Sequence, residues 1–154
     1  MPSQSVAKSA VTTGPGLTLK RRIAASPEKI YAAWTEPENL IRWFGPAMVK
    51  QETVRADIDA RIGGRYRIRF EDDRGEYHEV GGTYRELVPP SRLVFSWAWH
   101  STPERESQVT VLLKPDGAGT LLTLHHEQLF DAAARDAHQH GWLGTLDKLQ
   151  RILG

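Results

Sequence analysis

The sequence predicts an α+β fold in which a strongly curved antiparallel sheet of about seven strands grips one long C-terminal helix. Two observations lead to this prediction. Segments with alternating apolar and polar residues follow one another between residues 49 and 127, separated by short turns that are typical of antiparallel neighbours. Helical periodicity is confined to residues 26–44 and to the chain after Asp131. Strands and helices are therefore segregated rather than alternating, which argues against a doubly wound nucleotide-binding fold.

The N-terminal residues predict a leader followed by a strand. Residues 1–16 are mainly Ser, Thr, Ala, Gly and Pro without periodicity, so we expect a flexible leader there. Leu17 and Leu19 then alternate with polar residues, which predicts a strand over about 17–24. Residues 17–154 are expected to form a single domain, because 154 residues with 40% hydrophobic content suit one fold unit.

Two short helices are predicted after this strand. The tripeptide Ser26-Pro27-Glu28 can start a helix, since serine caps backbone N–H groups, proline suits the first turn and the acid favours the positive end of the helix dipole. A capping-box pattern beginning at Thr35 predicts a second short helix. We expect this helix to carry Trp43 and Phe44 and to end at Gly45-Pro46.

Six further strands are predicted from the alternation, over residues 49–58, 65–71, 77–87, 92–100, 107–114 and 120–127. In the second of these, Tyr66, Ile68 and Phe70 share one face while three arginines share the other, so the sheet should have a buried and a solvated face. The glycine pair at 63–64 is interpreted as a hairpin turn, and the pair at 81–82 as a bulge or bend.

The last predicted element is one long helix. Asp131 is a candidate N-cap, and bulky side chains then recur with a period of 3.6 residues. The stripe along one face consists of Ala134, His138, Trp142, Leu146, Leu149 and Leu153. We expect this stripe to pack against the sheet.

Composition argues against several kinds of site and partner. Lys and Arg number 20 against 19 Asp and Glu, and a net charge of +1 gives no support for binding nucleic acid or an anionic membrane. The chain has no cysteine, which excludes disulfides, thiol nucleophiles and thiolate metal sites. No segment approaches the roughly 18 apolar residues of a membrane span, and the first residues lack the apolar run of a secretory signal. We therefore expect a cytoplasmic protein without membrane insertion.

The six histidines are not spaced as metal ligands. His125 and His126 should point to opposite faces of a strand, and His138 and His140 to different sides of a helix, so neither pair converges as an i, i+4 zinc pair does. A nucleophilic serine elbow and a phosphate-binding glycine loop are also missing from the sequence. We predict no metal and no cofactor.

Five stretches of the sequence, taken in order, resemble one known family. They are SPEKIYAAWTEPENLIRWFGP, the glycine pair before RYRIRF, ELVPPSRLVFSW, LLTLHHEQL and HQHGWLGTLDKLQRIL. The family is the activator of heat-shock protein 90 ATPase homologue-like family, within the START-like, birch-pollen-allergen-like helix-grip (SRPBCC) superfamily. The resemblance covers residues 17–153, and PPSRLVFSW and the His138-x-x-Gly141-Trp142 segment are its most specific parts.

The resemblance implies a cavity between the curved sheet and the long helix, with the two short helices closing one end. Members of the superfamily use this cavity for lipids, sterols, hormones and polyketides, and a few carry out cyclisation, dehydration or hydrolysis there. It places Trp43 and Phe44 at the lid. It also places Tyr66, Ile68 and Phe70 on the floor of the cavity, with Trp142, Leu146 and Leu149 on the helix above.

The other predicted lining residues come from two strands and the long helix. Phe95, Trp97 and Trp99 share the larger face of their strand and should point inward. The resemblance implies that the strand face carrying His126 also points inward. His138 lies one helical turn before Trp142, so we expect it to face the same interior. His126 and Tyr66 are the candidates for acid–base catalysis, since a histidine can move a proton at neutral pH; the alternative for His126 is a packed side chain bonded to a backbone carbonyl.

Three functions remain open from the sequence. The first is the binding of a small, largely apolar molecule, for which aromatic walls with a few polar tips are typical. The second is an enzyme of the polyketide cyclase/dehydratase or hydrolase type that uses the same cavity. The third is a chaperone-associated or other protein-interaction module, and a homodimer is compatible with each. The same aromatic rings could also fill a solid core, since each buries about 150–250 Å².

Overall fold

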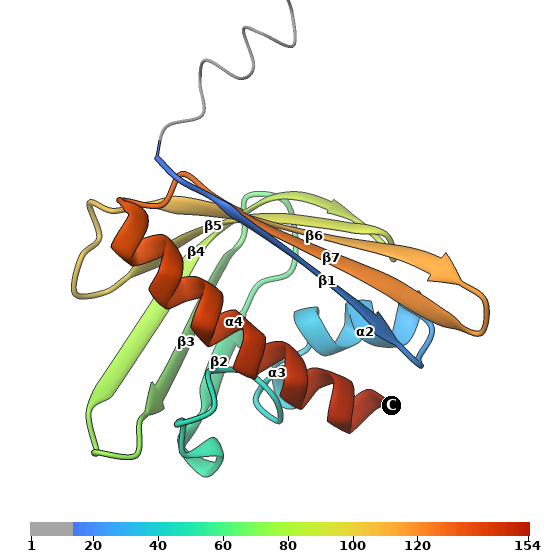
Figure 1. The fold of residues 1–154 in the computed structure, drawn as a ribbon, viewed down its shortest axis with the longest axis horizontal. Helices are drawn as coiled ribbons and strands as arrows, with labels where there is room; N and C mark the ends of the chain where they lie inside the picture. The colour runs from blue at the N-terminus through green and yellow to red at the C-terminus, as the bar shows by residue number, and fades with distance from the viewer. Residues whose placement is uncertain (1–13) are drawn as a thin grey trace, which may run out of the picture.

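A computed structural model describes residues 14–154 and shows seven antiparallel strands in one curved sheet, in the order β1-β7-β6-β5-β4-β3-β2 (Figure 1). The strands are β1 (Leu17–Ile23), β2 (Arg55–Ile58), β3 (Arg65–Glu71), β4 (Tyr77–Val88), β5 (Arg92–Trp99), β6 (Ser107–Asp116) and β7 (Gly119–Glu127). The helices are α2 (Pro27–Thr35), α3 (Pro37–Leu40), the 3₁₀-helix η1 (Gln51–Thr53) and α4 (Ala132–Leu153). This arrangement confirms the predicted α+β helix-grip class.

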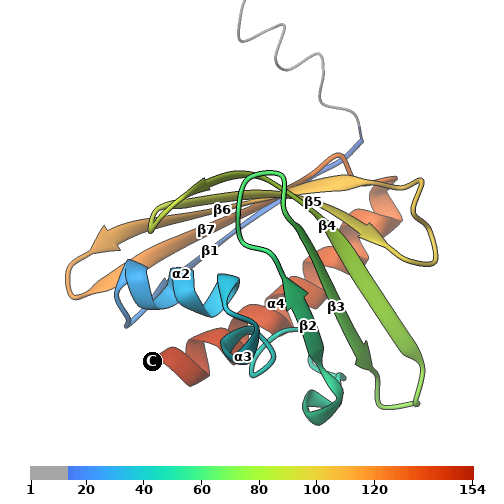
Figure 2. The ribbon, with the colours of Figure 1, turned by 180° about the vertical axis from the view of Figure 1, so that it is seen from behind.

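Helix α4 lies across one face of the sheet, and α2 and α3 lie near its C-terminal half (Figures 1 and 2). The capping box predicted at Thr35 is wrong, because the N-cap of α3 is Glu36 without a side-chain capping bond, and Thr35 Oγ1 donates to the carbonyl of Tyr31 at 2.9 Å. The other two helix starts follow the predicted capping chemistry. Ser26 Oγ accepts the backbone N–H of Lys29 at 3.1 Å, and Asp131 Oδ1 accepts that of Ala134 at 2.8 Å. Both side chains satisfy donors that a helix leaves free in its first turn.

The sheet buries the face that the alternation predicts. Tyr66, Ile68 and Phe70 of β3 are all at most 5% exposed, whereas Arg65 and Arg67 are exposed. Leu122, Leu124 and His126 of β7 are fully buried. The concave side of the sheet therefore carries one continuous apolar surface that α2, α3 and α4 cover.

Glycine allows β4 and β5 to come close at the point where the sheet curves. A Cβ on Gly82 would lie 2.0 Å from the carbonyl oxygen of Ser96, which no side chain permits. The paired positions of the two strands break between Gly81 and Tyr84, where Ser96 Oγ accepts the N–H of Thr83 at 2.8 Å. The bulge or bend predicted at 81–82 lies slightly later in the strand, as a register shift between Tyr84 and Glu86.

The structure corrects the strand predicted over residues 49–58. Val49 forms only an isolated bridge with Asp72, η1 follows, and β2 begins at Arg55. The reason is that a side chain competes for the backbone: Thr53 Oγ1 donates to the carbonyl of Lys50 at 2.7 Å and accepts the N–H of Glu71 at 2.9 Å. These bonds hold a turn where the sequence pattern predicts a strand.

The second short helix is also shorter than predicted. Helix α3 ends at Leu40, so Trp43 and Phe44 lie in the turns that follow it. Gly45, at φ +100°, then redirects the chain. Of the predicted leader, residues 1–13 lie outside the described residues.

Candidate functional site

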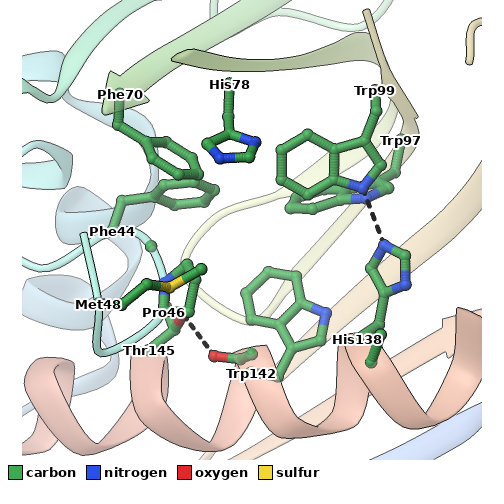
Figure 3. A pocket seen from close by; sticks show the side chains of 13 residues that line it. Phe44, Pro46, Met48, Phe70, His78, Trp97, Trp99, His138, Trp142 and Thr145 are labelled. Carbon is green, nitrogen blue, oxygen red and sulfur yellow. Dashed lines mark hydrogen bonds between the residues drawn. The ribbon is translucent and has the colours of Figure 1, made fainter. Parts of the chain in front are cut away.

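A pocket of about 240 Å³ opens between the N-terminal half of α4 and the sheet (Figure 3). Its walls come from the segment after α3, from β3, β4 and β5, and from α4. They consist of Phe44, Gly45, Pro46, Met48, Phe70, His78, Trp97, Trp99, Ala137, His138, Gly141, Trp142 and Thr145. Rings face this space from several sides, with His78 between Phe70 and Trp99 in Figure 3.

Strand alternation and register bring the rings of the sheet together. Trp97 and Trp99 are two residues apart on β5, so both point to the concave side, and their rings meet edge to face with centroids 5.6 Å apart. Phe70 and His78 are paired across β3 and β4, and their rings stack at 5.2 Å. The aromatic wall thus follows from the pattern of three neighbouring strands.

Small residues on α4 leave the space beneath it open and allow the segment after α3 to close one side. A Cβ on Gly144 would lie 3.0 Å from the backbone nitrogen of Ala47, so a larger residue there would push the segment away. Lys148 Nζ donates to the carbonyl of Pro46 at 3.2 Å and to Gln51 Oε1 at 2.6 Å. Residues 44–51 are thereby fastened to the helix at the edge of the pocket.

A hydrogen-bond chain fixes Trp142, one of the residues that line the pocket. Its indole N–H donates to His126 Nδ1 at 3.0 Å, so the ring proton of His126 resides on Nε2 and is donated to Ser107 Oγ at 2.8 Å. The Ser107 hydroxyl in turn donates to the carbonyl of Trp97 at 3.2 Å. Every polar atom of this buried histidine is thereby satisfied.

A second, parallel chain fixes Trp99 in the pocket wall. Its indole N–H donates to His138 Nε2 at 3.0 Å, and His138 Nδ1 donates to the carbonyl of Ala134 at 2.7 Å. The rings of His126 and His138 lie edge to face at 5.0 Å. Burial lowers the pKa of both histidines, and the nearby His138 lowers that of His126 further. Both rings are therefore neutral acceptors for tryptophan at neutral pH.

One wall residue carries a buried donor without a partner. Trp97 Nε1 is inaccessible to solvent and has no hydrogen-bond partner among the described residues, and Trp34 Nε1 is in the same state. An unsatisfied buried donor costs about 1–3 kcal/mol. The N–H group is not exposed in the pocket, so the ring of Trp97 contributes to the pocket wall and its N–H group does not.

Comparison with known sequences and structures places this geometry in a family. A sequence model described as activator of Hsp90 ATPase homolog 1-like protein matches residues 24–154. The chain belongs to this family. It has the START-like fold, whose members commonly bind hydrophobic ligands. No curated protein matches the chain.

Solved structures of similar proteins superpose over most of the chain. A protein from Chromobacterium violaceum is 28% identical with a TM-score of 0.78, covering 90% of this chain and 96% of that one. The AHSA1 protein from Silicibacter pomeroyi is 29% identical with a TM-score of 0.76, covering 90% and 97%. CalU16 from Micromonospora echinospora is 26% identical with a TM-score of 0.66, covering 90% and 76%.

Half of the twelve predicted lining residues surround the pocket. These six are Phe44, Phe70, Trp97, Trp99, His138 and Trp142. They come from four separate parts of the chain, and only the fold brings them together. Their role in ligand binding stays a prediction.

The other six predicted lining residues lie elsewhere in the interior: Trp43, Tyr66, Ile68, Phe95, His126 and Leu146. Tyr66, Ile68 and Phe95 border a gap of only about 20 Å³, which is too small for a ligand. Trp43 and Leu146 are at most 1% exposed. Trp43 and the three residues around the small gap fill the end of the interior that α2 and α3 close. His126 lies beside His138 instead, with ring centroids 5.0 Å apart.

Neither candidate catalytic residue lines the open pocket. The Tyr66 hydroxyl donates to the carbonyl of Ser96 at 2.7 Å, and burial raises its pKa well above the usual value, with Tyr84 and Glu106 adding to the shift. Both ring nitrogens of His126 are engaged, as described above. Their catalytic role stays a prediction that this arrangement does not favour.

The sequence interpretation missed seven lining residues: Gly45, Pro46, Met48, His78, Ala137, Gly141 and Thr145. The signal for His78 was present, since it has the same parity on its strand as the buried Val80 and Tyr84. Gly45, Pro46 and Met48 lie in the irregular segment after Phe44, where no periodicity predicts which side chains point inward. The small residues on α4 line the pocket because they leave room, which an apolar stripe does not indicate.

Two further observations bear on cofactors and membranes. Among residues 14–154, no three His, Asp or Glu side chains are grouped so as to hold a metal ion. Within the same part of the chain, no helix is long and apolar enough to cross a bilayer.

Proposed function

We propose that this protein binds a small, planar, largely apolar molecule in the pocket under the N-terminal half of α4. The observation that carries the proposal is the contrast in packing within one interior, where a 240 Å³ pocket lies beside a gap of about 20 Å³. Protein interiors are normally packed to crystal density, so an opening of this size with aromatic walls needs an explanation. A bound molecule provides one.

The size and walls of the pocket indicate the class of molecule. An apolar cavity of about 150 Å³ accommodates benzene, so a 240 Å³ pocket has room for two fused rings. Phe44, Trp97 and Trp142 offer flat faces, with centroids 5.2 Å apart for the two indoles and 6.2 Å for Phe44 and Trp97. At these distances the rings touch one another and form one aromatic wall, against which a flat ring gains offset or edge contacts.

Binding of naphthalene, measured by equilibrium dialysis, tests the proposal. Gly141 lines the pocket, and a Cβ there would have only Pro46 Cβ nearby, at 3.8 Å, so a leucine side chain can extend into the free space. We expect Gly141→Leu to weaken naphthalene binding at least tenfold, roughly the loss of 1.4 kcal/mol of contact. Gln139→Leu, on the exposed side of the same helix, is the matched control.

The proposal is wrong if the wild-type protein does not bind naphthalene, or if Gly141→Leu binds it as well as the control does. The chaperone-associated role, the homodimer and the cytoplasmic location expected from the sequence stay predictions. An enzymatic role that uses Tyr66 and His126 is not favoured, because neither residue lines the pocket.

A further inference from the structure

The pocket wall holds a histidine–aspartate pair that the proposed function does not use. His78 Nε2 lies 2.9 Å from Asp72 Oδ2. The Asp72 carboxyl group is 93% buried, at 7% side-chain exposure, whereas the His78 side chain is 33% exposed and lines the pocket. His78 is also held from the side, because its ring stacks on Phe70 and meets Trp99 edge to face.

The surroundings of Asp72 fix which nitrogen of His78 carries the proton. Asp72 Oδ1 accepts the backbone N–H groups of Arg74 and Glu76, each at 2.9 Å. These bonds lower the pKa of the Asp72 carboxyl group to about 2. The hydrogen bond from His78 is the largest cause, and the two backbone bonds add to it. The carboxylate is therefore ionised and can only accept, so His78 Nε2 must donate. A neutral His78 then carries its lone pair on Nδ1.

His78 Nδ1 makes no hydrogen bond to any residue that the structure describes. This state differs from that of His126 and His138, whose two ring nitrogens are both engaged within the protein. Of the three histidines around the aromatic cluster, His78 is the one with a nitrogen to spare. A carboxylate behind an imidazole also orients the ring and strengthens the opposite nitrogen as a proton acceptor.

We propose that His78, oriented by Asp72, accepts a hydrogen bond from a hydroxyl group on the aromatic ring of the bound molecule, so that the ligand is a planar phenol. The inference rests on the proposed function of the pocket and names the polar group that the apolar walls leave unspecified. A phenolic hydroxyl suits this place because it lies in the plane of the ring. It is also more acidic than an aliphatic hydroxyl, with a pKa near 10, and is therefore the better hydrogen-bond donor. No covalent bond changes in this step.

A pair of probes that differ by one hydroxyl isolates this contact. The dissociation constants of 2-naphthol and naphthalene are measured by equilibrium dialysis for each variant, and their ratio removes what the two probes share. Replacing His78 with phenylalanine keeps a flat ring on Phe70 and removes the acceptor nitrogen. We expect the preference for 2-naphthol to fall about three- to tenfold in His78→Phe, the ratio that one net hydrogen bond provides.

Asp72→Asn provides a second test that leaves His78 in place. The asparagine oxygen can still accept from Arg74 and Glu76, which turns its NH₂ group toward His78 Nε2. Nε2 must then accept, the proton moves to Nδ1, and Nδ1 can no longer accept from a hydroxyl. The same loss of preference for 2-naphthol is expected, with naphthalene affinity unchanged. A merely structural role of Asp72 would weaken both probes together.

Two controls match these variants. His140→Phe replaces an exposed histidine of α4 that lies outside the pocket, and Asp73→Asn replaces the exposed neighbour of Asp72. Both should keep the wild-type ratio. Equal ratios in wild type, His78→Phe and Asp72→Asn would overturn this inference while leaving the proposed function standing. Failure of the wild type to bind either probe would overturn both.

Discussion

The two ends of the interior are built from the same kinds of side chain and differ in what lies opposite the sheet. At the closed end, Trp34 of α2 and Leu40 of α3 meet Tyr66 and Phe95 of the sheet, and the gap left is about 20 Å³. At the open end, Trp97 and the rings around it enclose about 240 Å³. Aromatic content alone therefore does not distinguish a core from a pocket.

Helix α4 accounts for much of the difference. Its C-terminal half presents Leu146 and Leu149, both fully buried. Its N-terminal half lines the pocket with Ala137 and Gly141, which are too small to reach the sheet. The comparison teaches that this space depends on small residues along one helix, and that no special residue is needed to make it.

The largest effect expected from this comparison is on stability. Trp43 is 1% exposed, donates its indole N–H to the carbonyl of Ala33 at 3.2 Å and packs on Trp34 at 4.8 Å. We expect Trp43→Ala to lower the free energy of unfolding by about 3–5 kcal/mol. Trp99 lines the open pocket and is only partly buried, so Trp99→Ala should lower the free energy of unfolding by only about 1–2 kcal/mol. Urea denaturation measures both, and equal losses would erase the distinction between the two ends.

A medium effect is expected from pH. The pKa of His126 is held well below its usual value by burial and by His138, so the unfolded chain takes up a proton that the folded chain does not. Stability is then fully present above about pH 6.5 and is lost as the pH falls, by up to about 1.4 kcal/mol per pH unit for this residue.

Chemical denaturation between pH 7 and pH 5 tests this prediction. The dependence of stability on pH should become shallower in His126→Gln. His125→Gln, on the opposite face of β7 where the side chain bonds to Thr18 at 2.9 Å, is the matched comparison. A variant of His126 with the wild-type dependence would show that this histidine is not the buried neutral group.

The smallest effect concerns the segment that closes the open end. Lys148→Met keeps the apolar stem and removes the bonds to Pro46 and Gln51. We expect a loss of about 1 kcal/mol in unfolding free energy, together with faster amide exchange over residues 44–51. Unchanged exchange in this segment would mean that Lys148 does not fasten it to α4.

Much of the fold was predictable because it depends on local patterns. The alternation of Tyr66, Ile68 and Phe70 identified the buried face of β3, and Ser26 and Asp131 identified two helix starts that the structure confirms. The errors fall where side chains bind backbone at a distance. Thr53 bonds to the carbonyl of Lys50 and to the N–H of Glu71, and no periodicity indicates such bonds.

The site was predictable only in part, because a face does not determine a volume. The strand pattern places Phe95 and Trp97 on the same side of β5, yet Phe95 lies in the filled end and Trp97 borders both ends. The alternation along β4 indicates that His78 points inward, although it was not predicted as a lining residue. The pairing of His78 with Asp72 could not be predicted from that alternation. Pairs of this kind depend on register between strands and on the turn that joins them.

The indole N–H signals of the five tryptophans test the central claim most directly. They can be followed by ¹H–¹⁵N NMR while naphthalene is added. If the open end is a binding pocket, the signals of Trp97, Trp99 and Trp142 should shift most, because these rings line it. Trp34 and Trp43, at the closed end, should shift least. Shifts that are largest at Trp34 and Trp43, or no shift at any indole, would contradict the account.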